Sequence, residues 1–295
     1  MKRIAFIGLG KMGAPMVQNL LKHGYLVTVF DIVPAAIKSC VDQGAQSANS
    51  PQEAVQNAEA VWTMLQTGEQ VKGVCLGENG IFQKLSSNTL YIDSSSIDIE
   101  STRCLHQQAA QNNIAMLDAP VSGGVKGATD ATLTIMVGGS PENFERAKLL
   151  LNAVGKNVYY AGALGNGQAA KICNNMILGI NMIAVSEAFT LAEKLGLDPK
   201  TFFEISSHAS GACWAMIHYN PVPGVIENVP ANNRYQPGFT AAMMLKDLKL
   251  SQEAAKLAHV ATQMGAKATE LYQQWIDHNY GQLDFSSIIQ MLQDS

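Results

Sequence analysis

The stretch RIAFIGLGKMG, residues 3–13, decides the fold of this chain. It begins as a β-type apolar run and ends in the pattern GxGxxG, whose glycines are Gly8, Gly10 and Gly13. Residues 14–24 continue with apolar residues at helical spacing, so the glycines lie where a strand turns into a helix. Asp31 follows at the end of the next β-type run. A strand, this turn, a helix and that acid together predict a dinucleotide-binding unit.

The glycine turn suits the pyrophosphate of a dinucleotide. Glycines allow a tight turn and a close approach of the backbone, and the N-terminus of the next helix offers free N–H groups and a positive dipole. We expect Lys11 and Met12, which lie inside the turn, to contact the cofactor as well. The alternative, an ordinary strand-to-helix turn, accounts poorly for all four features together.

Asp31 indicates which dinucleotide is preferred. A carboxylate at this position accepts hydrogen bonds from both ribose hydroxyls of NAD and repels the 2′-phosphate of NADP. No arginine follows in residues 32–34 to compensate that phosphate. We therefore expect NAD to be the cofactor, with the alternative that Asp31 only caps the next helix.

β-type and helical runs alternate over the first half of the chain. The predicted strands are 3–8, 25–31, 60–65, 89–95, 114–120, 131–139 and 157–162, and the clearest helices are 14–24, 34–44 and 141–154. Alternation of apolar strands with helices predicts an α/β domain whose parallel sheet is covered by helices on both faces.

The second half of the chain carries no further β-type runs. Helical patterns cover 165–195, a segment that starts at Asp198 and Pro199, and then 241–259, 262–278 and 285–292. We predict a boundary near residue 162, with a first domain over 1–162, an all-α domain over 163–295, and helix 165–195 between them. The proline-rich segment 219–239 is the one long irregular stretch, and long loops in compact domains are often functional.

Helix 165–195 contains one unusual charge. Lys171 is the only Asp, Glu, Lys or Arg between Lys156 and Glu187. Asn175 lies four residues later and shares its face of the helix. A lysine in partly dry surroundings has a lowered pKa and can exchange protons near neutral pH, so Lys171 is a candidate general acid/base and Asn175 a candidate substrate contact. The alternative is a lysine that reaches along the helix to water.

Three further groups of residues lie where ligands collect. Ser122, Gly123 and Gly124 follow a strand and could present a hydroxyl and two open N–H groups to a carboxylate, although a plain turn explains them as well. Met64, Leu65 and Ser96 come at the ends of two other strands, at the edge of the sheet. Lys246 lies in an otherwise apolar helix face and could bring a second cation to the cleft, or it could form a surface pair with Lys249.

Composition excludes several classes of protein. The net charge is −4 and no basic block occurs, which argues against a nucleic-acid partner. No uninterrupted apolar run of membrane-spanning length appears, and the N-terminus resembles neither a signal peptide nor an import leader. The five cysteines are scattered and form no CxxC pair, and the six histidines show no ligand spacing, so we expect no metal site and a reduced, cytoplasmic protein.

These motifs, in this order, resemble those of the β-hydroxyacid dehydrogenase family over essentially the whole chain. FIGLGKMGAPM is similar to the family's cofactor signature, DAPVSGGVKGA to its substrate signature, GNGQAAKICNN to its catalytic helix and KDLKL to its late cofactor lysine. Within the family, CNNMILGINMIAVSEA and YNPVPGV resemble the 3-hydroxyisobutyrate dehydrogenase branch.

The resemblance implies a fold and a reaction. The fold is an N-terminal Rossmann domain, a long interdomain helix and a helical C-terminal domain, assembled as a homodimer or homotetramer. The reaction is NAD-dependent oxidation of a small 3-hydroxy acid, 3-hydroxyisobutyrate of valine catabolism, to its semialdehyde. By motif, Lys171 is the catalytic acid/base, Ser122, Gly123, Gly124 and Asn175 hold the substrate, and the cofactor contacts are Gly8, Gly10, Gly13, Asp31, Leu65, Ser96 and Lys246.

Two departures from the branch stand out. Ala131 replaces a glycine that is usual before Thr132 and Leu133, which costs little if the backbone angles allow it. Ala212 stands where an arginine is usual, which affects specificity if that arginine binds substrate. Two rival functions stay open: a related reductase acting on tartronate, glyoxylate or succinic semialdehyde, and a cofactor-binding module without catalysis.

Overall fold

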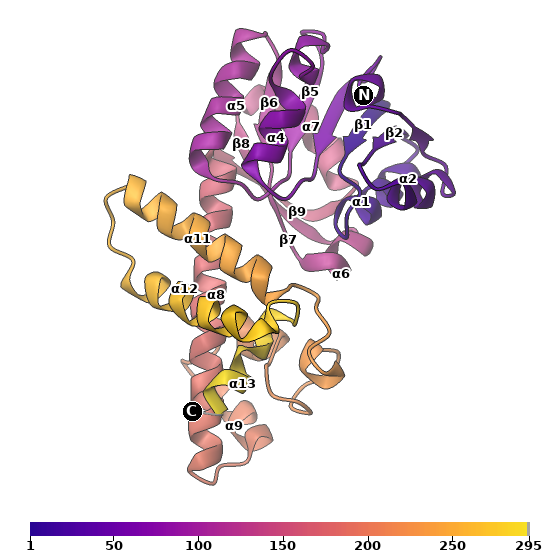
Figure 1. Ribbon diagram of the computed structural model, residues 1–295. Helices are drawn as coiled ribbons and strands as arrows, with labels where there is room; N and C mark the ends of the chain where they lie inside the picture. Colours follow the sequence, from indigo (N-terminus) through magenta and orange to yellow (C-terminus); the bar gives the residue numbers. More distant parts are fainter. Residues whose placement is uncertain (294–295) are drawn as a thin grey trace. The chain divides into compact units, whose positions relative to one another are not determined.

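The computed structural model describes residues 1–293 and divides into two compact units. The first unit runs from Met1 to Lys171, and the second begins at Ile172. The helix α8 (Asn166–Lys194) passes from one into the other and is continuous over its 29 residues (Figure 1). The predicted fold class, an α/β first domain and a helical second domain joined by a long helix, is confirmed.

The first unit is built on one nine-stranded sheet. Its strands are β1 (Arg3–Ile7), β2 (Leu26–Phe30), β3 (Gln46–Ser47), β4 (Ala60–Thr63), β5 (Leu90–Asp93), β6 (Ala115–Asp118), β7 (Val121–Ser122), β8 (Leu133–Gly139) and β9 (Gly155–Gly162). Its helices are α1 (Gly13–Lys22), α2 (Pro34–Val41), α3 (Pro51–Ala54), α4 (Gly68–Cys75), the 3₁₀ turn η1 (Ile81–Gln83), α5 (Ile99–Gln111), α6 (Gly124–Thr129) and α7 (Pro141–Asn152).

The strand order places a ligand-binding edge. The sheet runs β3-β2-β1-β4-β5-β6-β8-β7, and β9 pairs with β8. Successive crossovers move outward from β1 to β2 and β3, and then the chain returns to the other side of β1 with β4. In such sheets ligands bind at the carboxyl ends of the strands beside this reversal, here β1 and β4.

The predicted parallel sheet is found for six strands, but one end of the sheet is antiparallel. The strands β3, β2, β1, β4, β5 and β6 are parallel, but β8 runs antiparallel to both β6 and β7. A parallel pair needs a crossover of a dozen or more residues. The connection from β6 to β7 is only two residues, and the short helix α6 fills the connection from β7 to β8, so the chain turns back on itself instead.

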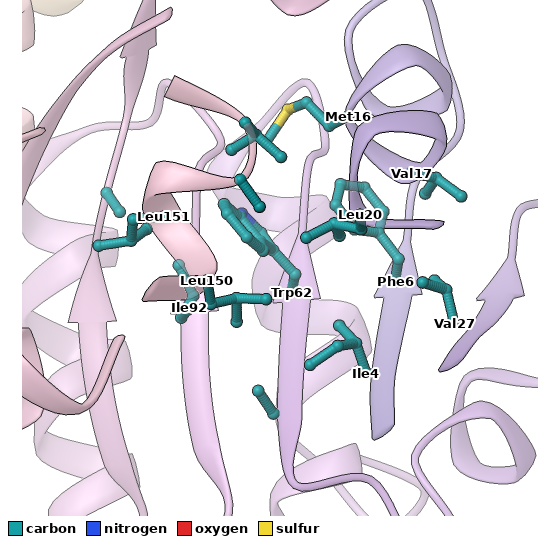
Figure 2. Close-up of a cluster of buried hydrophobic side chains, with 14 of the residues drawn as sticks. Ile4, Phe6, Met16, Val17, Leu20, Val27, Trp62, Ile92, Leu150 and Leu151 are labelled. Atoms are coloured by element: carbon teal, nitrogen blue, oxygen red, sulfur yellow. The ribbon is translucent and has the colours of Figure 1, made fainter. Parts of the chain in front are cut away.

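Alternating side chains give the sheet a hydrophobic core on each face. From β1, Ile4 and Phe6 enter one core while Ala5 and Ile7 enter the other. The first core receives α1 and α7, and Figure 2 shows Trp62 within it. The second core receives α3, α4 and α5. This period of two along each strand is what a sheet covered on both faces requires.

The second unit is helical. After α8 come α9 (Pro199–Ser206), α10 (Trp214–His218), η2 (Pro230–Asn233), α11 (Ala241–Leu257), α12 (Gln263–Trp275), a π turn η3 (Ile276–Tyr280), η4 (Phe285–Ser287) and α13 (Ile288–Gln293). Met182 and Phe189 of α8 share a core with Leu248 of α11 and with Tyr272 and Trp275 of α12. The short helix α10 was not predicted because residues 214–218 give only one turn of pattern.

Segment 219–239 is an ordered loop held by buried polar groups. Asp284 is fully buried, and its carboxylate accepts hydrogen bonds from Tyr219 Oη (2.9 Å) and from the backbone N–H groups of Gly238 (3.0 Å) and Phe239 (3.1 Å). Its other oxygen accepts from both donors of Ser286. Asp284 therefore ties both ends of the loop to the segment before α13.

The long helix α8 meets the length and hydropathy of a membrane span, as core helices of globular proteins also do. In its most apolar window, 44% of the residues are buried within the structure.

Candidate active site

The three glycines of the first turn have different surroundings. A Cβ at Gly8, whose φ is +98°, would collide with the carbonyl oxygen of Met64, and a Cβ at Gly13 would collide with that of Gly8. These two glycines let β1, β4 and α1 approach closely. A Cβ at Gly10 would meet no atom within 4 Å, so Gly10 is not required by packing. The open space beside Gly10 is what the close approach of a pyrophosphate needs.

Asp31 lies against this turn, directly after β2. Its Oδ2 accepts a hydrogen bond from Leu9 N at 2.6 Å, and its Oδ1 accepts one from Val33 N at 2.8 Å. Val33, not Asp31, occupies the N-cap position of α2, so the alternative role as a helix cap does not describe the structure. Each carboxylate oxygen keeps acceptor capacity for a ribose hydroxyl. The residues present at this edge therefore fit a dinucleotide.

The segments after β4 and β5, which carry the predicted cofactor residues Met64, Leu65 and Ser96, are joined to each other. Leu65 N donates to Ser95 Oγ at 2.8 Å, and Met64 N donates to the carbonyl of Ile7 at the end of β1. Ser96 follows directly and is half-buried. These bonds bring the ends of β1, β4 and β5 into one edge with the glycine turn, as the predicted site requires. Lys11 is exposed and Met12 is half-buried.

Asp93, at the end of β5, was not predicted as part of this edge. Its side chain is buried, and its Oδ1 accepts from Thr63 Oγ1 (2.9 Å) and Ser95 N (3.1 Å). Its Oδ2 is buried without a hydrogen-bond partner among the residues described. Burial raises the pKa of Asp93 to about 6, against the lowering effect of the Ser95 and Thr63 hydrogen bonds. The signal in the sequence that could have indicated Asp93 is its position as the single carboxylate at the end of an apolar strand.

The proposed carboxylate seat has an unusual backbone. Ser122 ends β7, and Gly123 and Gly124 follow with φ of +136° and +62°, which favour glycine. A Cβ at Gly124 would meet nothing within 4 Å, whereas one at Gly123 would lie 3.1 Å from Leu133 Cδ2. The helix α6, which begins at Gly124, is tied to α1 through Asn19, whose amide donates to Ala128 O at 2.7 Å.

Lys171 and Asn175 lie one turn apart on α8 and are both buried, with exposed fractions of 8% and 2%. The Asn175 amide is held on two sides, because its Nδ2 donates to Asp247 of α11 and its Oδ1 accepts from Asn174 Nδ2 at 3.0 Å. Asp247 was not predicted to have this role.

Lys246 belongs to the second unit, on α11. Its Nζ lies 3.9 Å from Asp247 Oδ1. Lys249 instead donates to Gln273 Oε1 on α12 at 2.8 Å. The two lysines therefore have different partners. Ala212 is exposed in the connection between α9 and α10.

A bound metal ion needs a cluster of ligating side chains. Within residues 1–293, no group of three or more His, Cys, Asp or Glu side chains is arranged to hold an ion.

Comparison with known proteins gives matches over the whole chain. Residues 3–162 match the family described as the NAD binding domain of 6-phosphogluconate dehydrogenase. Residues 165–292 match the family described as NAD-binding of NADP-dependent 3-hydroxyisobutyrate dehydrogenase.

Among similar proteins, an NAD-dependent L-serine dehydrogenase of Pseudomonas aeruginosa is 47% identical over 294 residues, which cover 100% of this chain and 98% of that protein. The human mitochondrial 3-hydroxyisobutyrate dehydrogenase is 44% identical and covers 99% of this chain and 87% of its own. A solved structure of Mycobacterium tuberculosis 3-hydroxyisobutyrate dehydrogenase with L-serine is 42% identical, with a TM-score of 0.94 and 99% of both chains covered.

Proposed function

This chain belongs to the β-hydroxyacid dehydrogenase family, and we propose that it oxidises 3-hydroxyisobutyrate to methylmalonate semialdehyde with NAD⁺. At the coarser level, the chain is an NAD(P)-dependent oxidoreductase of this family. The observation that carries the proposal is the buried Lys171 at the start of α8, one turn before a buried asparagine.

The proposed mechanism assigns one task to each part of the site. Ser122, Gly123 and Gly124 hold the substrate carboxylate, and Asn175 holds the substrate from α8. A bound NAD⁺ would supply the acceptor for the hydride of the hydroxymethyl carbon. Nζ of Lys171, neutral before the step, takes the hydroxyl proton, and in the reverse direction it returns that proton to the aldehyde oxygen. Proton transfer of this kind contributes about 10²–10⁴-fold to a rate.

The proposed cofactor site uses the edge of the sheet. Gly8 and Gly13 allow the close packing that shapes the turn, Gly10 leaves room for the pyrophosphate, and the carboxylate of Asp31 receives the ribose hydroxyls. NAD is preferred over NADP because a 2′-phosphate would meet the negative charge of Asp31, which Leu9 N holds in place. Met64, Leu65 and Ser96 line the same edge, and Lys246 is the remaining proposed cofactor contact.

L-Serine is the second candidate substrate. It has the same 3-hydroxyl and carboxylate as 3-hydroxyisobutyrate, but an ammonium group replaces the methyl group at C2. The relative that is 47% identical is an L-serine dehydrogenase, and L-serine is present in the similar solved structure. Apolar protein side chains facing C2 of the substrate would favour the methyl group of 3-hydroxyisobutyrate. A protein hydrogen-bond acceptor facing C2 would favour the ammonium group of L-serine.

Assembly and surroundings are also proposed. We propose a homodimer or homotetramer in the cytoplasm that acts on a small hydroxy acid, without a nucleic-acid or membrane partner. The support is the family resemblance, the net charge of −4 and the scattered free cysteines.

The first experiment is a matched substrate panel. NADH or NADPH formation is followed with 3-hydroxyisobutyrate and L-serine, using NAD⁺ and NADP⁺ in parallel. Tartronate semialdehyde, succinic semialdehyde and glyoxylate are tested in the reverse direction with NADH and NADPH. We expect the highest kcat/KM for 3-hydroxyisobutyrate with NAD⁺. A higher value for L-serine moves the assignment to the second candidate. No turnover despite NADH binding contradicts both and supports a binding module.

The variant Lys171→Ala tests the catalytic assignment. We expect a folded protein that binds NADH and loses about 10²–10⁴-fold in kcat, because the general acid/base is gone. Lys194→Ala is the matched control, since Lys194 is an exposed lysine in the last turn of the same helix. Near-full activity of Lys171→Ala would remove Lys171 from the mechanism.

A further inference from the structure

The first turn of α8 is capped by a side chain from another element. Gly165 occupies the N-cap position, because its carbonyl accepts the first intrahelical bond, from Ala169 N. Glycine has no side chain to satisfy the free N–H groups of a helix start. Asp118, at the end of β6, does this instead: its Oδ1 accepts from Gly165 N (2.8 Å) and its Oδ2 from Gln168 N (3.0 Å).

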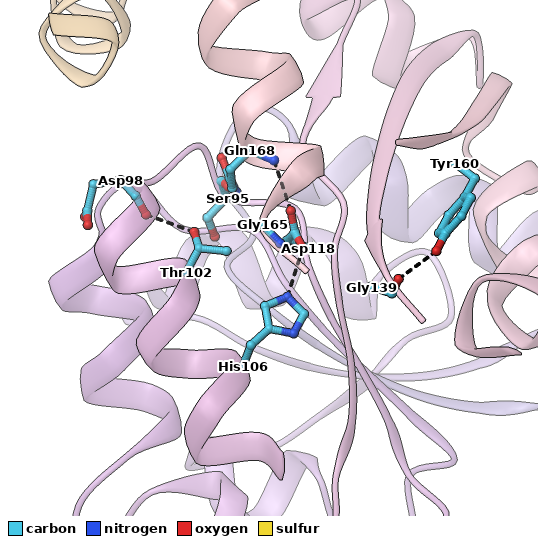
Figure 3. Close-up of polar contacts among 9 residues, drawn as sticks. All are labelled: Ser95, Asp98, Thr102, His106, Asp118, Gly139, Tyr160, Gly165 and Gln168. Carbon is cyan, nitrogen blue, oxygen red and sulfur yellow. Dashed lines mark hydrogen bonds and ion pairs between the residues drawn. The ribbon is translucent and has the colours of Figure 1, made fainter. Parts of the chain in front are cut away.

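The residues around the Asp118 carboxylate leave space for it and contact it. Asp118 is fully buried, and His106 of α5 contacts its Oδ1 through Nε2 at 2.9 Å (Figure 3). A Cβ at Gly138 would lie 2.6 Å from Oδ1, and a Cβ at Gly167 would lie 2.8 Å from Oδ2. Two glycines thus leave the space in which β6, β8 and the start of α8 converge. The negative charge at a helix N-terminus is also favoured by the helix dipole.

Gln168 fixes the same turn to the loop after β5. Its side chain is fully buried, and its Nε2 donates to the carbonyl of Ser95 at 2.5 Å. Its Oε1 accepts from Ile97 N at 3.3 Å. The two bonds bracket Ser96, a proposed cofactor contact. Lys171 lies three residues after Gln168, one turn along the helix.

We propose that Gln168 and Asp118 are positioning residues for Lys171. Asp118 fixes where α8 begins, and Gln168 sets its first turn against the Ser95–Ile97 loop, so the Lys171 amine and the cofactor edge keep one geometry. This inference rests on the proposed function, in which Lys171 transfers the proton. The residues that carry this inference, Gln168, Asp118, Lys171, Ser95 and Ile97, all belong to the first unit.

Gln168→Met tests the proposal, because methionine keeps the length and volume but can neither donate to Ser95 nor accept from Ile97. We expect kcat on the substrate that the panel identifies to fall about 10- to 100-fold, since a displacement of about 1 Å can cost this much. We expect KM and the NADH dissociation constant to change less than threefold. Gln168→Glu keeps the acceptor for Ile97 N but loses the donor to Ser95 O. We expect its kcat to lie between those of Gln168→Met and wild type.

Leu150→Ala is the control for general loss of stability. Leu150 is buried on α7 in the same unit and makes none of these bonds. We expect Leu150→Ala to lower the melting temperature at least as much as Gln168→Met while keeping kcat within threefold of wild type. A kcat of Gln168→Met within threefold of wild type overturns the proposal, as does an equal loss in both variants.

A second measurement is independent of turnover. Hydrogen exchange of the peptide covering residues 163–171 is compared between wild type and Gln168→Met, with the α7 peptide as reference. Faster exchange confined to the first turn of α8 supports the positioning role, and unchanged exchange overturns it. If the wild-type protein oxidises none of the panel, the proposed function fails, and this measurement still decides the geometric part.

Discussion

Ala131 adopts a backbone conformation that favours glycine. Its φ is +55°, and Thr132 N donates to Gly127 O at 2.9 Å, which closes α6 in the manner of a Schellman motif. Alanine was expected to cost little stability here if the backbone angles suited it. The positive φ shows that they do not suit a residue with a Cβ. A left-handed residue with a Cβ costs about 1–2 kcal/mol.

The variant Ala131→Gly is therefore expected to be more stable. The relief of strain is partly offset by about 0.4–1 kcal/mol of extra entropy in the unfolded chain, so the expected gain in unfolding free energy is roughly 0.5–1 kcal/mol. Urea unfolding measures it. Ala110→Gly, at an exposed site inside α5, should instead lose about 1 kcal/mol. A lower midpoint for Ala131→Gly than for wild type contradicts this reading.

Asp93 is expected to make stability depend on pH. Burial raises its folded pKa to about 6, above its value in the unfolded chain, so the folded protein binds more protons between about pH 4 and 6. Its contribution to stability is present below that window and is lost as the pH rises through the folded pKa. Above pH 6 the fold carries the cost of a buried carboxylate, which Thr63 and Ser95 offset in part.

Asp93→Asn removes that charge. The unfolding free energy of the variant minus that of wild type is expected to rise between pH 4 and pH 7, by up to roughly 3 kcal/mol, because only the wild type has a charge to bury. Thermal unfolding at several pH values gives the difference. Asp277→Asn, an exposed control, should give a flat difference. A flat difference for Asp93→Asn would show that Asp93 has no raised pKa.

The loop 219–239 has few helical or strand bonds of its own and depends on Asp284. Removing that carboxylate leaves the part-buried donors of Tyr219, Gly238 and Phe239 and the buried donors of Ser286 without their acceptor. Each such donor costs about 1–3 kcal/mol when unsatisfied. The loop is thus held from a segment that follows it by about fifty residues.

Asp284→Ala is expected to lower the unfolding free energy by at least about 3 kcal/mol and to open the loop to proteolysis before the helices unfold. Chemical unfolding and limited proteolysis with mapped cut sites measure both effects. Asp277→Ala should change stability by less than about 0.5 kcal/mol, because its side chain is exposed. An intact, uncut loop in Asp284→Ala would contradict the role of Asp284.

The second unit exposes large apolar side chains that a single chain leaves in water. Leu191 in the last turn of α8 is 60% exposed, Leu195 directly after α8 is 77% exposed, and Ile205 on α9 is 57% exposed. We expect size-exclusion chromatography with light scattering to give two or four times the chain mass of 31.6 kDa. Leu195→Asp is expected to lower that mass. Leu149→Asp, on α7 of the first unit, is the control, and a monomeric wild type contradicts the proposed assembly.

Local pattern predicted the elements because its signals act within a few residues. The glycine turn, the apolar strands and the helical spacing of residues 14–24 indicated β1, α1 and the edge where Asp31 lies. The lone Lys171 in an apolar helix indicated a buried lysine, which the structure shows at 8% exposure. The roles of the site residues remain predictions for the experiments above.

The sequence by itself determined the order of strands and helices, the dinucleotide fingerprint and the identity of the lysine, since each depends on neighbours in the chain. Only the tertiary structure decided the reversal of β8, the cap that Asp118 places on α8, and the anchoring of segment 219–239 by Asp284. These features join residues from about 12 to 65 positions apart. A carboxylate leaves no periodic trace in the sequence of the distant N–H groups that will donate to it. Burial creates the need for those bonds, and burial exists only once the elements have packed.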